Sequence, residues 1–597
     1  MEITHYSQIF KKQVNKYGNR IALRYKDNGT WKETSWKSFG EQVDALSKAL
    51  VQLGVKVHDC VGIFSQNRPE WTIVDFAAIG IRAVPVPLYP TSTARQAEYI
   101  INDARIRILF VDDRAQYEKA LILLGTNPFL KNVIVFNGNL PIAGNDAVCC
   151  FTDLLKKGRQ SNLDAEVAAR LNQAQKEDLL TLVYTSGTTG EPKGVMLTHA
   201  NILFQAEQHD QRLLNPNDSD ISLCFLPLSH VFERIWTYYV FSKGMTNVYL
   251  DDPSKIIEFI PEVKPTIMCA VPRFYEKIYA AVYNRLESAS PMKKTLFHWA
   301  IKMGRAFHNR RKDKLAISTL LALKYKIADK LVLKKIRDLT GGRVRFFPCA
   351  GAPLSQEIEE FFYAVGMFVC YGYGLSETTA TVTCHEPHFF NFGAVGKPLP
   401  GVEVIIDPIN SEVLIRGGNI MKGYYNKPEE TARVLTEDGF FRTGDAGEFD
   451  DNGELRITDR IKDLIKTSGG KYIAPQMLET LVCADFYIEQ ISIIGERKKY
   501  VTALIIPSFP ALEEYAEAKG IKFTFREDLI KSPKILNFYK QRIEGLTKDI
   551  APFEKIKKFT LLAREFTMDS DEITPTMKVR RNIIHENYKD IIEAMYD

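Results

Sequence analysis

The sequence lacks several features that would place it in a special class of protein. No apolar run among its 597 residues reaches the roughly 18–20 residues that a membrane-spanning helix needs. Its nine cysteines form no CxxC pair and no Cys/His cluster, which argues against a zinc site and favours free thiols in a reducing compartment. The opening MEITHYSQIFKKQVNKYG has lysines and a glycine where a signal peptide would keep an apolar stretch. These absences predict a cytoplasmic protein.

The chain also has little net charge. Its 78 Lys and Arg residues oppose 73 Asp and Glu, and the resulting +5 does not indicate a nucleic-acid partner. Hydrophobic residues make up 45% and charged residues 25%, which is the balance of an ordinary globular protein. Because a domain usually has about 100–200 residues, we expect three or more lobes.

Short apolar runs alternate with helical patterns in the first part of the chain. Strand, helix, strand, helix and strand are predicted at Val61–Ser65, Pro69–Ile79, Ala83–Pro87, Ala94–Asp103 and Ile108–Asp112. Such alternation favours parallel sheets covered by helices on both faces. At about 395–455 the pattern changes to short alternating strands separated by Gly, Asp and Asn, which predicts a small antiparallel sheet or barrel. A mixed α/β stretch follows 459 and is long enough for a separate lobe.

One basic segment stands out. Between 293 and 337 there are fourteen Lys or Arg residues, and the only acidic residues are Asp313 and Asp329. Apolar residues are interleaved with the basic ones. The pattern is typical of two basic amphipathic helices. They form either a solvated helical hairpin or a surface that contacts an anionic membrane.

The strongest local motif is YTSGTTGEPKGV at 184–195, directly after an apolar run. Three glycines and several hydroxyl residues allow the backbone to approach an anion closely and donate hydrogen bonds to it. Lys193 adds a positive charge for a phosphate. The segment does not fit the Walker A pattern GxxxxGK[ST].

This motif resembles the signature of the adenylate-forming (AMP-binding) superfamily. Six further motifs of that family follow in the same order, namely FLPLSH at 225–230, AGAPL at 350–354, YGYGLSE at 371–377, RTGD at 442–445, DRIKDLIK at 459–466 and TPTMK at 574–578. VPLYPTSTA at 86–94, PRFYEKI at 272–278, KTSGGKYI at 466–473 and the basic helical insert at about 285–340 resemble the bacterial long-chain fatty acyl-CoA synthetases within it.

The resemblance implies an α/β fold with a large N-terminal domain and a smaller, mobile α+β C-terminal domain. The N-terminal domain, 1–459, is expected to contain two parallel-type β/α sheet subdomains and a small antiparallel β-barrel. The C-terminal domain, 460–597, is expected to rotate about a hinge near 460–462.

The resemblance also implies roles for individual residues. Catalytic roles fall on Lys193, His230, Glu377 and Lys578. The ATP or AMP site would comprise Thr185, Ser186, Gly187, Thr188, Thr189, Gly190, Gly351, Ala352, Pro353, Tyr373, Gly374, Ser376, Asp445 and Arg460. The coenzyme A side and the hinge would comprise Lys462, Lys466, Ser468, Gly469 and Gly470.

The chemistry of these residue types suits such roles. An aromatic ring such as Tyr373 can lie against the face of adenine. One carboxylate, at Glu377, can hold Mg²⁺ together with phosphate oxygens, and the family pattern adds Thr185 as a second metal contact. Asp445 can accept hydrogen bonds from both ribose hydroxyls, with Arg460 as its partner.

The implied reaction activates a long-chain fatty acid as acyl-AMP with ATP and then transfers the acyl group to coenzyme A. Two alternatives are a fatty acyl-AMP ligase that loads an acyl carrier protein and a non-catalytic lipid-binding scaffold. No long insert follows Lys466, which favours coenzyme A, and intact Glu377, Asp445 and Lys578 argue against a scaffold. Some long-chain members carry a gating Trp four residues after the motif histidine, where this chain has Arg234, with Trp236 two residues later.

Overall fold

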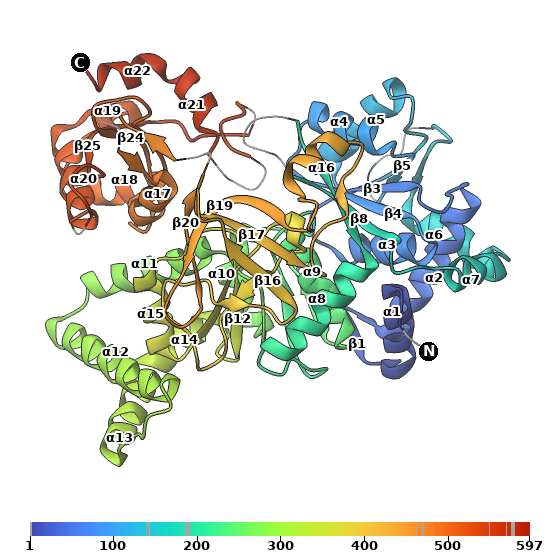
Figure 1. Cartoon of the computed structure of the whole chain (residues 1–597), viewed down its shortest axis with the longest axis horizontal. Helices are drawn as coiled ribbons and strands as arrows, with labels where there is room; N and C mark the ends of the chain where they lie inside the picture. Colours follow the sequence, from blue (N-terminus) through green and yellow to red (C-terminus); the bar gives the residue numbers. More distant parts are fainter. Residues whose placement is uncertain are drawn as a thin grey trace.

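A large domain and a smaller C-terminal domain make up the molecule (Figure 1). The structure is a computed structural model that describes residues 3–138, 140, 144–185, 191–461, 464–468, 471–548, 550–568, 570–574 and 579–597. Within these residues, no helix is both long enough and apolar enough to cross a membrane.

The first sheet confirms the predicted β-α-β-α-β order. Its five parallel strands run in the order β4-β3-β5-β6-β7, with bounds Val84–Leu88, Cys60–Phe64, Ile108–Val111, Asn132–Val135 and Val148–Cys150. Alternate strand residues enter two different cores. One face packs against α2 (Trp36–Gln52), α3 (Pro69–Gly80) and α6 (Phe151–Gln160), with α7 (Asp164–Asn172) beside them. The other face packs against α4 (Ala94–Ala104) and α5 (Arg114–Thr126).

The second sheet is parallel in its middle and antiparallel at both edges. It comprises β2 (Thr30–Ser35), β1 (Ile21–Asp27), β11 (Thr246–Tyr249), β10 (Ile221–Cys224), β12 (Phe346–Cys349), β13 (Phe368–Tyr373), β14 (Thr383–Cys384) and β15 (Lys397–Pro398). Parallel bridges of Ile267 to Ser222 and Phe346 join its two halves. The β1–β2 edge is antiparallel because Asn28 and Gly29 both take positive φ, 47° and 78°, and turn the chain back in a tight hairpin.

Six helices surround this second sheet and its junction with the first. They are α1 (Tyr6–Tyr17), α8 (His199–Arg212), α9 (Val231–Ser242), α10 (Ile256–Val263), α11 (Pro272–Glu287) and α15 (Gln356–Val365). The basic segment forms two main helices, as predicted. These are α12 (Pro291–Lys312) and α13 (Thr319–Ala328), followed by a π-turn at Asp329–Leu333 and α14 (Lys334–Arg337), and the pair projects from the body in Figure 1.

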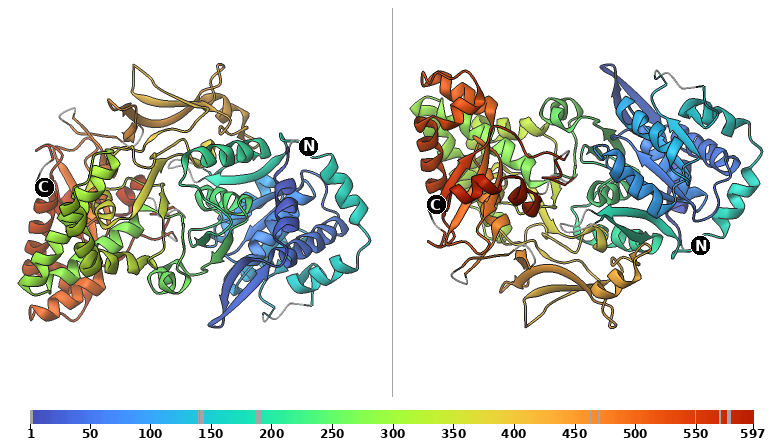
Figure 2. Two further views of the ribbon diagram at one scale, coloured as in Figure 1. Left: turned by 90° about the horizontal axis from the view of Figure 1, so that it is seen from below. Right: turned by 90° about the horizontal axis from the view of Figure 1, so that it is seen from above.

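The predicted antiparallel sheet lies to one side of the body, as Figure 2 shows. Its strands, in the order β16-β17-β19-β20, are Val402–Ile406, Glu412–Gly417, Phe441–Phe449 and Leu455–Arg460. A second antiparallel sheet contains the hairpin β8 (Leu179–Thr185) and β9 (Lys193–Thr198) with β18 (Gly423–Tyr424). Helix α16 (Pro428–Val434) follows β18.

The C-terminal domain has a core of its own, formed by residues from 465 onward. Strands β23 (Ile488–Ile494), β24 (Val501–Pro507) and β25 (Ile556–Leu561) form its main sheet, and β21 (Ile465–Lys466) pairs with β22 (Tyr472–Ile473). Its helices are α17 (Pro475–Cys483), α18 (Phe509–Ala518), α19 (Arg526–Lys531), α20 (Pro533–Leu546), α21 (Arg581–Asn587) and α22 (Lys589–Ala594).

Candidate active site

A buried carboxylate lies where the antiparallel sheet meets strand β13. Asp445 of β19 pairs with Arg460 at the end of β20 and is 3% exposed. Its Oδ2 accepts a hydrogen bond from the Tyr373 hydroxyl at 2.5 Å, and its Oδ1 accepts one from Arg460 Nε at 3.1 Å. Burial and the Asp445 charge raise the pKa of Tyr373 well above its usual value, so the hydroxyl stays a donor. The structure therefore brings together three predicted nucleotide-site residues.

A tight turn at Gly444 sets the direction of the Asp445 carboxylate. Gly444 has φ 72°, a conformation that favours glycine, and its N–H donates to Glu412 Oε1 at 2.9 Å. The Asp445 N–H donates to Thr443 Oγ1 at 3.0 Å. The RTGD motif therefore forms a turn whose hydrogen bonds fix the direction of the Asp445 side chain.

A tyrosine links two further predicted residues, Glu377 and Lys193. The Tyr424 hydroxyl donates to Glu377 Oε1 at 2.8 Å, and Lys193 Nζ lies 5.0 Å from the centre of the Tyr424 ring. Lys193 Nζ also forms an ion pair with Glu430 Oε2 of α16 at 2.5 Å. That hydrogen bond lowers the pKa of Glu430, so its carboxyl group is ionised at neutral pH.

The glycine-rich motif joins two antiparallel strands, β8 and β9. Thr185, at the end of β8, pairs with Lys193, at the start of β9. The strand is anchored because the Tyr184 hydroxyl donates to Asp103 Oδ2 at 2.6 Å. The predicted phosphate residues Ser186, Gly187, Thr188, Thr189 and Gly190 lie outside the described residues.

Two turns surround the end of β13. Tyr371 holds the AGAPL turn, since its hydroxyl donates to the Ala352 carbonyl at 3.3 Å and accepts from the Leu354 N–H at 3.0 Å. Gly351 has φ 95°, and it is exposed together with Ala352 and Pro353. Gly374 must lack a side chain, because a Cβ there would lie 2.0 Å from the Ala380 carbonyl oxygen. Ser376 begins the short 3₁₀ turn Ser376–Thr378 that also carries Glu377.

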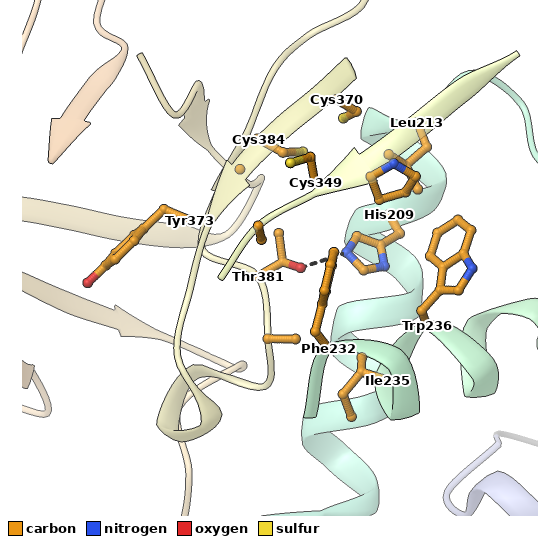
Figure 3. A pocket seen from close by; sticks show the side chains of 14 residues that line it. His209, Leu213, Phe232, Ile235, Trp236, Cys349, Cys370, Tyr373, Thr381 and Cys384 are labelled. Carbon is orange, nitrogen blue, oxygen red and sulfur yellow. Dashed lines mark hydrogen bonds between the residues drawn. The ribbon is translucent and has the colours of Figure 1, made fainter. Parts of the chain in front are cut away.

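A small apolar cavity of about 30 Å³ lies beside this strand end (Figure 3). The side chains around it include His209, Leu213, Phe232, Ile235, Trp236 and Thr381. His209 Nε2 and Thr381 Oγ1, 3.3 Å apart, form a polar contact in its wall. Burial lowers the pKa of His209 to about 4, so its ring is neutral at pH 7. Tyr373 also borders the cavity, but Figure 3 shows its ring pointing away from the other lining side chains.

His230 caps the N-terminus of α9, where its Nδ1 accepts a hydrogen bond from the Phe232 N–H at 3.2 Å. Asn67 holds the preceding loop, since it donates to the Leu226 carbonyl at 2.7 Å and accepts from the Leu228 N–H at 2.9 Å.

Arg234 lies four residues after the motif histidine His230. It is buried and forms an ion pair with Asp75, and its Nη1 donates to Thr181 Oγ1 at 2.5 Å. Trp236 instead lies in the cavity wall, and its indole N–H donates to Ser222 Oγ at 3.0 Å.

The predicted coenzyme A and hinge residues that the structure describes belong to the C-terminal domain. The Lys466 N–H donates to Glu496 Oε2 at 2.9 Å, and the Ser468 N–H donates to the Lys498 carbonyl at 3.0 Å. Lys462, Gly469, Gly470 and the catalytic candidate Lys578 lie outside the described residues.

Comparison with known proteins decides the family. The family model described as AMP-binding enzyme matches residues 10–425, and the model of the AMP-binding enzyme C-terminal domain matches 462–597. The chain belongs to the AMP-binding enzyme family. The long-chain-fatty-acid–CoA ligase FadD15 of Mycobacterium tuberculosis is 33% identical to this enzyme over 96% of this chain and 93% of that protein. Fatty acyl-CoA synthetase A of Dictyostelium discoideum is 31% identical over 98% of this chain and 88% of that protein.

Solved structures support the fold of the enzyme. The adenylation domain of a carboxylate reductase from Mycobacterium chelonae matches with a TM-score of 0.78 at 22% identity, over 100% of this chain and 91% of that one. The anthranilate CoA ligase AuaEII in complex with anthranoyl-AMP matches with a TM-score of 0.74 at 19% identity, over 100% and 99%. Both matches extend over the large domain and the smaller C-terminal domain of this chain.

Several residues at the site were not predicted from the sequence. Tyr424, Glu430, His209 and Thr381 belong to none of the motifs, and their partners are 47 to 237 residues away along the chain. No pattern in the sequence marks such pairs.

Proposed function

We propose that this enzyme activates a long-chain fatty acid with ATP, forming acyl-AMP and pyrophosphate, and then transfers the acyl group to coenzyme A with release of AMP. One observation carries the proposal. The end of β13 borders an apolar cavity on one side, while Tyr373 of the same strand reaches away from it to the buried Asp445. The cavity would have to widen to admit an acyl chain, and a fatty acid and a nucleotide on either side of this strand end would then bring the carboxylate close to the α-phosphate.

The first half-reaction needs alignment and charge rather than a covalent nucleophile. The acid carboxylate attacks the α-phosphorus in line, one P–O bond forms, and the bond to pyrophosphate breaks. Asp445, with Arg460, would hold the ribose hydroxyls, and Gly351–Pro353 and Tyr373 would border the adenine. Lys193 and Lys578 would neutralise the developing phosphate charge, while His230 would form one wall of the carboxylate site.

Mg²⁺ fits the residues present. No group of three or more His, Cys, Asp or Glu side chains suited to a metal occurs in the described part of the chain. Mg²⁺ on a nucleotide is usually held by one or two carboxylates plus phosphate oxygens and water, so Glu377 alone, with the hydroxyl of Thr185, is a sufficient donor set. Bound there, the ion would neutralise phosphate charge during adenylation.

The second half-reaction would follow a rotation of the C-terminal domain. We take 1–459 and 460–597 as the two domains, with the hinge at Arg460–Lys462 and with Lys466, Ser468, Gly469 and Gly470 on the coenzyme A side. Lys578→Ala should then slow acyl-AMP formation by about 10²–10³ and spare thioester formation from supplied acyl-AMP. Gly469→Leu should have the opposite effect, because a side chain there would obstruct the pantetheine arm. If both variants lose the same half-reaction, domain alternation is wrong.

The decisive experiment is exchange between pyrophosphate and ATP across straight-chain acids from acetate to C20. Each buried methylene contributes about 0.8 kcal/mol, so eight further carbons make up to a ~10⁴-fold preference available. We expect palmitate to exceed octanoate in kcat/KM by about ten-fold or more. Exchange driven best by acetate, an aromatic acid or an amino acid would refute the long-chain substrate, and its absence with every acid would refute adenylation.

We also propose that the enzyme is cytoplasmic and that the basic insert contacts an anionic membrane surface. An apolar ridge on α13 and the following π-turn supports this contact, because its four side chains are 43–60% exposed at helical spacing and lysines flank them. The ridge comprises Leu320, Leu323, Ile327 and Leu331. The opposite side of α13 is held to α12 by stacking of Tyr325 on Phe307, with ring centres 4.0 Å apart.

Sedimentation with anionic and neutral vesicles tests the contact. Leu320→Ser/Leu323→Ser should reduce binding to anionic vesicles by about ten-fold, and Lys324→Gln/Lys326→Gln should reduce both binding and its salt dependence. Ile409→Ser, at a highly exposed isoleucine far from the insert in sequence, is the matched control. Binding that is absent at low salt, or indifferent to all of these changes, contradicts the proposal.

A further inference from the structure

One arginine of the large domain reaches three acceptors on the C-terminal domain. Arg273 lies in the first turn of α11, and its Nη1 donates to the Cys483 carbonyl at 3.1 Å. Its Nη2 donates to the Glu489 carbonyl at 3.3 Å and lies 3.1 Å from Glu489 Oε1. Cys483 is the last residue of α17 and Glu489 belongs to β23, so the arginine connects two rigid elements of the other domain.

The chemistry of this contact suits an arginine in particular. A planar guanidinium can donate to several acceptors at once in a fixed geometry, whereas an ammonium acts as a single charge. The Cys483 carbonyl also lies at the C-terminal, partly negative end of α17, where a cation is favourable. On its own helix, Arg273 is 3.5 Å from the buried Glu276 Oε2, which holds the guanidinium in place.

Arg273 is also close to the candidate active site. Helix α11 begins just after Ala270, which bridges to Cys349, a residue of the cavity wall. Val271 is the nearest side chain to Gly351, 3.9 Å from the place that a Cβ would take. The Arg273 contact therefore links the C-terminal domain to the part of the large domain that would bind the nucleotide and the acid.

We infer that Arg273 is a positioning residue that stabilises one of the two domain arrangements and thereby sets the balance between the two half-reactions. The inference rests on the proposed function, in which the C-terminal domain rotates. The three acceptors are main-chain and side-chain atoms of α17 and β23, so a rigid rotation carries them out of reach together. Arg273 therefore stabilises the arrangement described here and contributes nothing to the other.

The test measures each half-reaction separately in Arg273→Gln, Arg273→Lys and a matched control. Lys277→Gln removes an exposed cation one turn along the same helix. Losing charge-assisted hydrogen bonds to two carbonyls and a half-exposed carboxylate should change the ratio of the two half-reaction rates by about ten-fold in Arg273→Gln. Arg273→Lys should change this ratio by about five-fold. Lys277→Gln should leave the ratio unchanged.

Small-angle X-ray scattering of the ligand-free protein gives a readout that does not depend on activity. Arg273→Gln should shift the scattering profile toward a second arrangement, and the Lys277→Gln profile should match that of the wild type. An unchanged ratio of half-reactions, or an equal loss of both with an unchanged profile, overturns the role of Arg273. Absence of acid-dependent exchange in the wild-type enzyme refutes the proposed function instead, so the two failures are distinguishable.

Discussion

Asp445→Asn is the sharpest perturbation of the nucleotide site, because it removes one charge and almost no volume. The carboxylate is buried and already accepts hydrogen bonds from Tyr373 at 2.5 Å and Arg460 at 3.1 Å. An amide retains only one acceptor oxygen, so it cannot serve both of these donors and two ribose hydroxyls. We therefore expect nucleotide binding to weaken while the fold is retained.

The magnitude follows from the kind of hydrogen bond that is lost. Hydrogen bonds to a charged group contribute about 1.5–3 kcal/mol, and neutral ones contribute about 0.5–1.5 kcal/mol. Converting the two proposed ribose hydrogen bonds from charged to neutral therefore costs about 2–3 kcal/mol. This corresponds to a dissociation constant for AMP that is about thirty- to hundred-and-fifty-fold larger.

Isothermal titration with AMP measures the effect, and two variants serve as controls. Glu448→Gln makes the same chemical change at an exposed position of the same strand and should leave AMP affinity unchanged. Tyr373→Phe removes one donor to Asp445 but keeps the charge, so its effect should be ten-fold or less. Equal AMP affinity in the wild type and in Asp445→Asn would refute the assignment of Asp445 to the ribose.

Three further predictions concern other parts of the molecule. Glu430→Gln should lower the KM for ATP by about two- to five-fold, because it frees Lys193 from a partly exposed ion pair, and a raised KM would contradict this. Asp75→Asn should destabilise the large domain by about 3–5 kcal/mol in urea unfolding, because it leaves a buried arginine without its counter-ion, and a loss under about 1 kcal/mol would contradict it. His209 has its pKa lowered from 6.5 to about 4 by burial, so the unfolded chain binds its proton first as the pH falls. Stability should drop between pH 6.5 and 4, by up to about 3 kcal/mol from this residue, and an equal pH slope in His209→Gln would contradict the role of burial.

The sequence alone determined the local organisation of the chain. Strand and helix alternation at 60–112 follows from apolar periodicity, which reports on backbone geometry over a few residues. The antiparallel sheet near 395–455 could be predicted because Gly, Asp and Asn mark its turns. The motifs also identified Tyr373, Asp445 and Arg460 as members of one site, and the structure places them in direct contact.

Only the tertiary structure decided which side chains complete that site. Glu430 lies 237 residues from Lys193, and Tyr424 lies 47 residues from Glu377, yet each is in direct contact with its partner. His209 and Thr381 meet in the cavity wall although 172 residues separate them. Such pairs depend on how whole sheets and helices pack, and packing is decided by the total apolar surface that they bury rather than by the residues next to them in sequence. For the same reason the cavity itself, whose wall combines two helices with the strands of the second sheet, has no signature in the sequence.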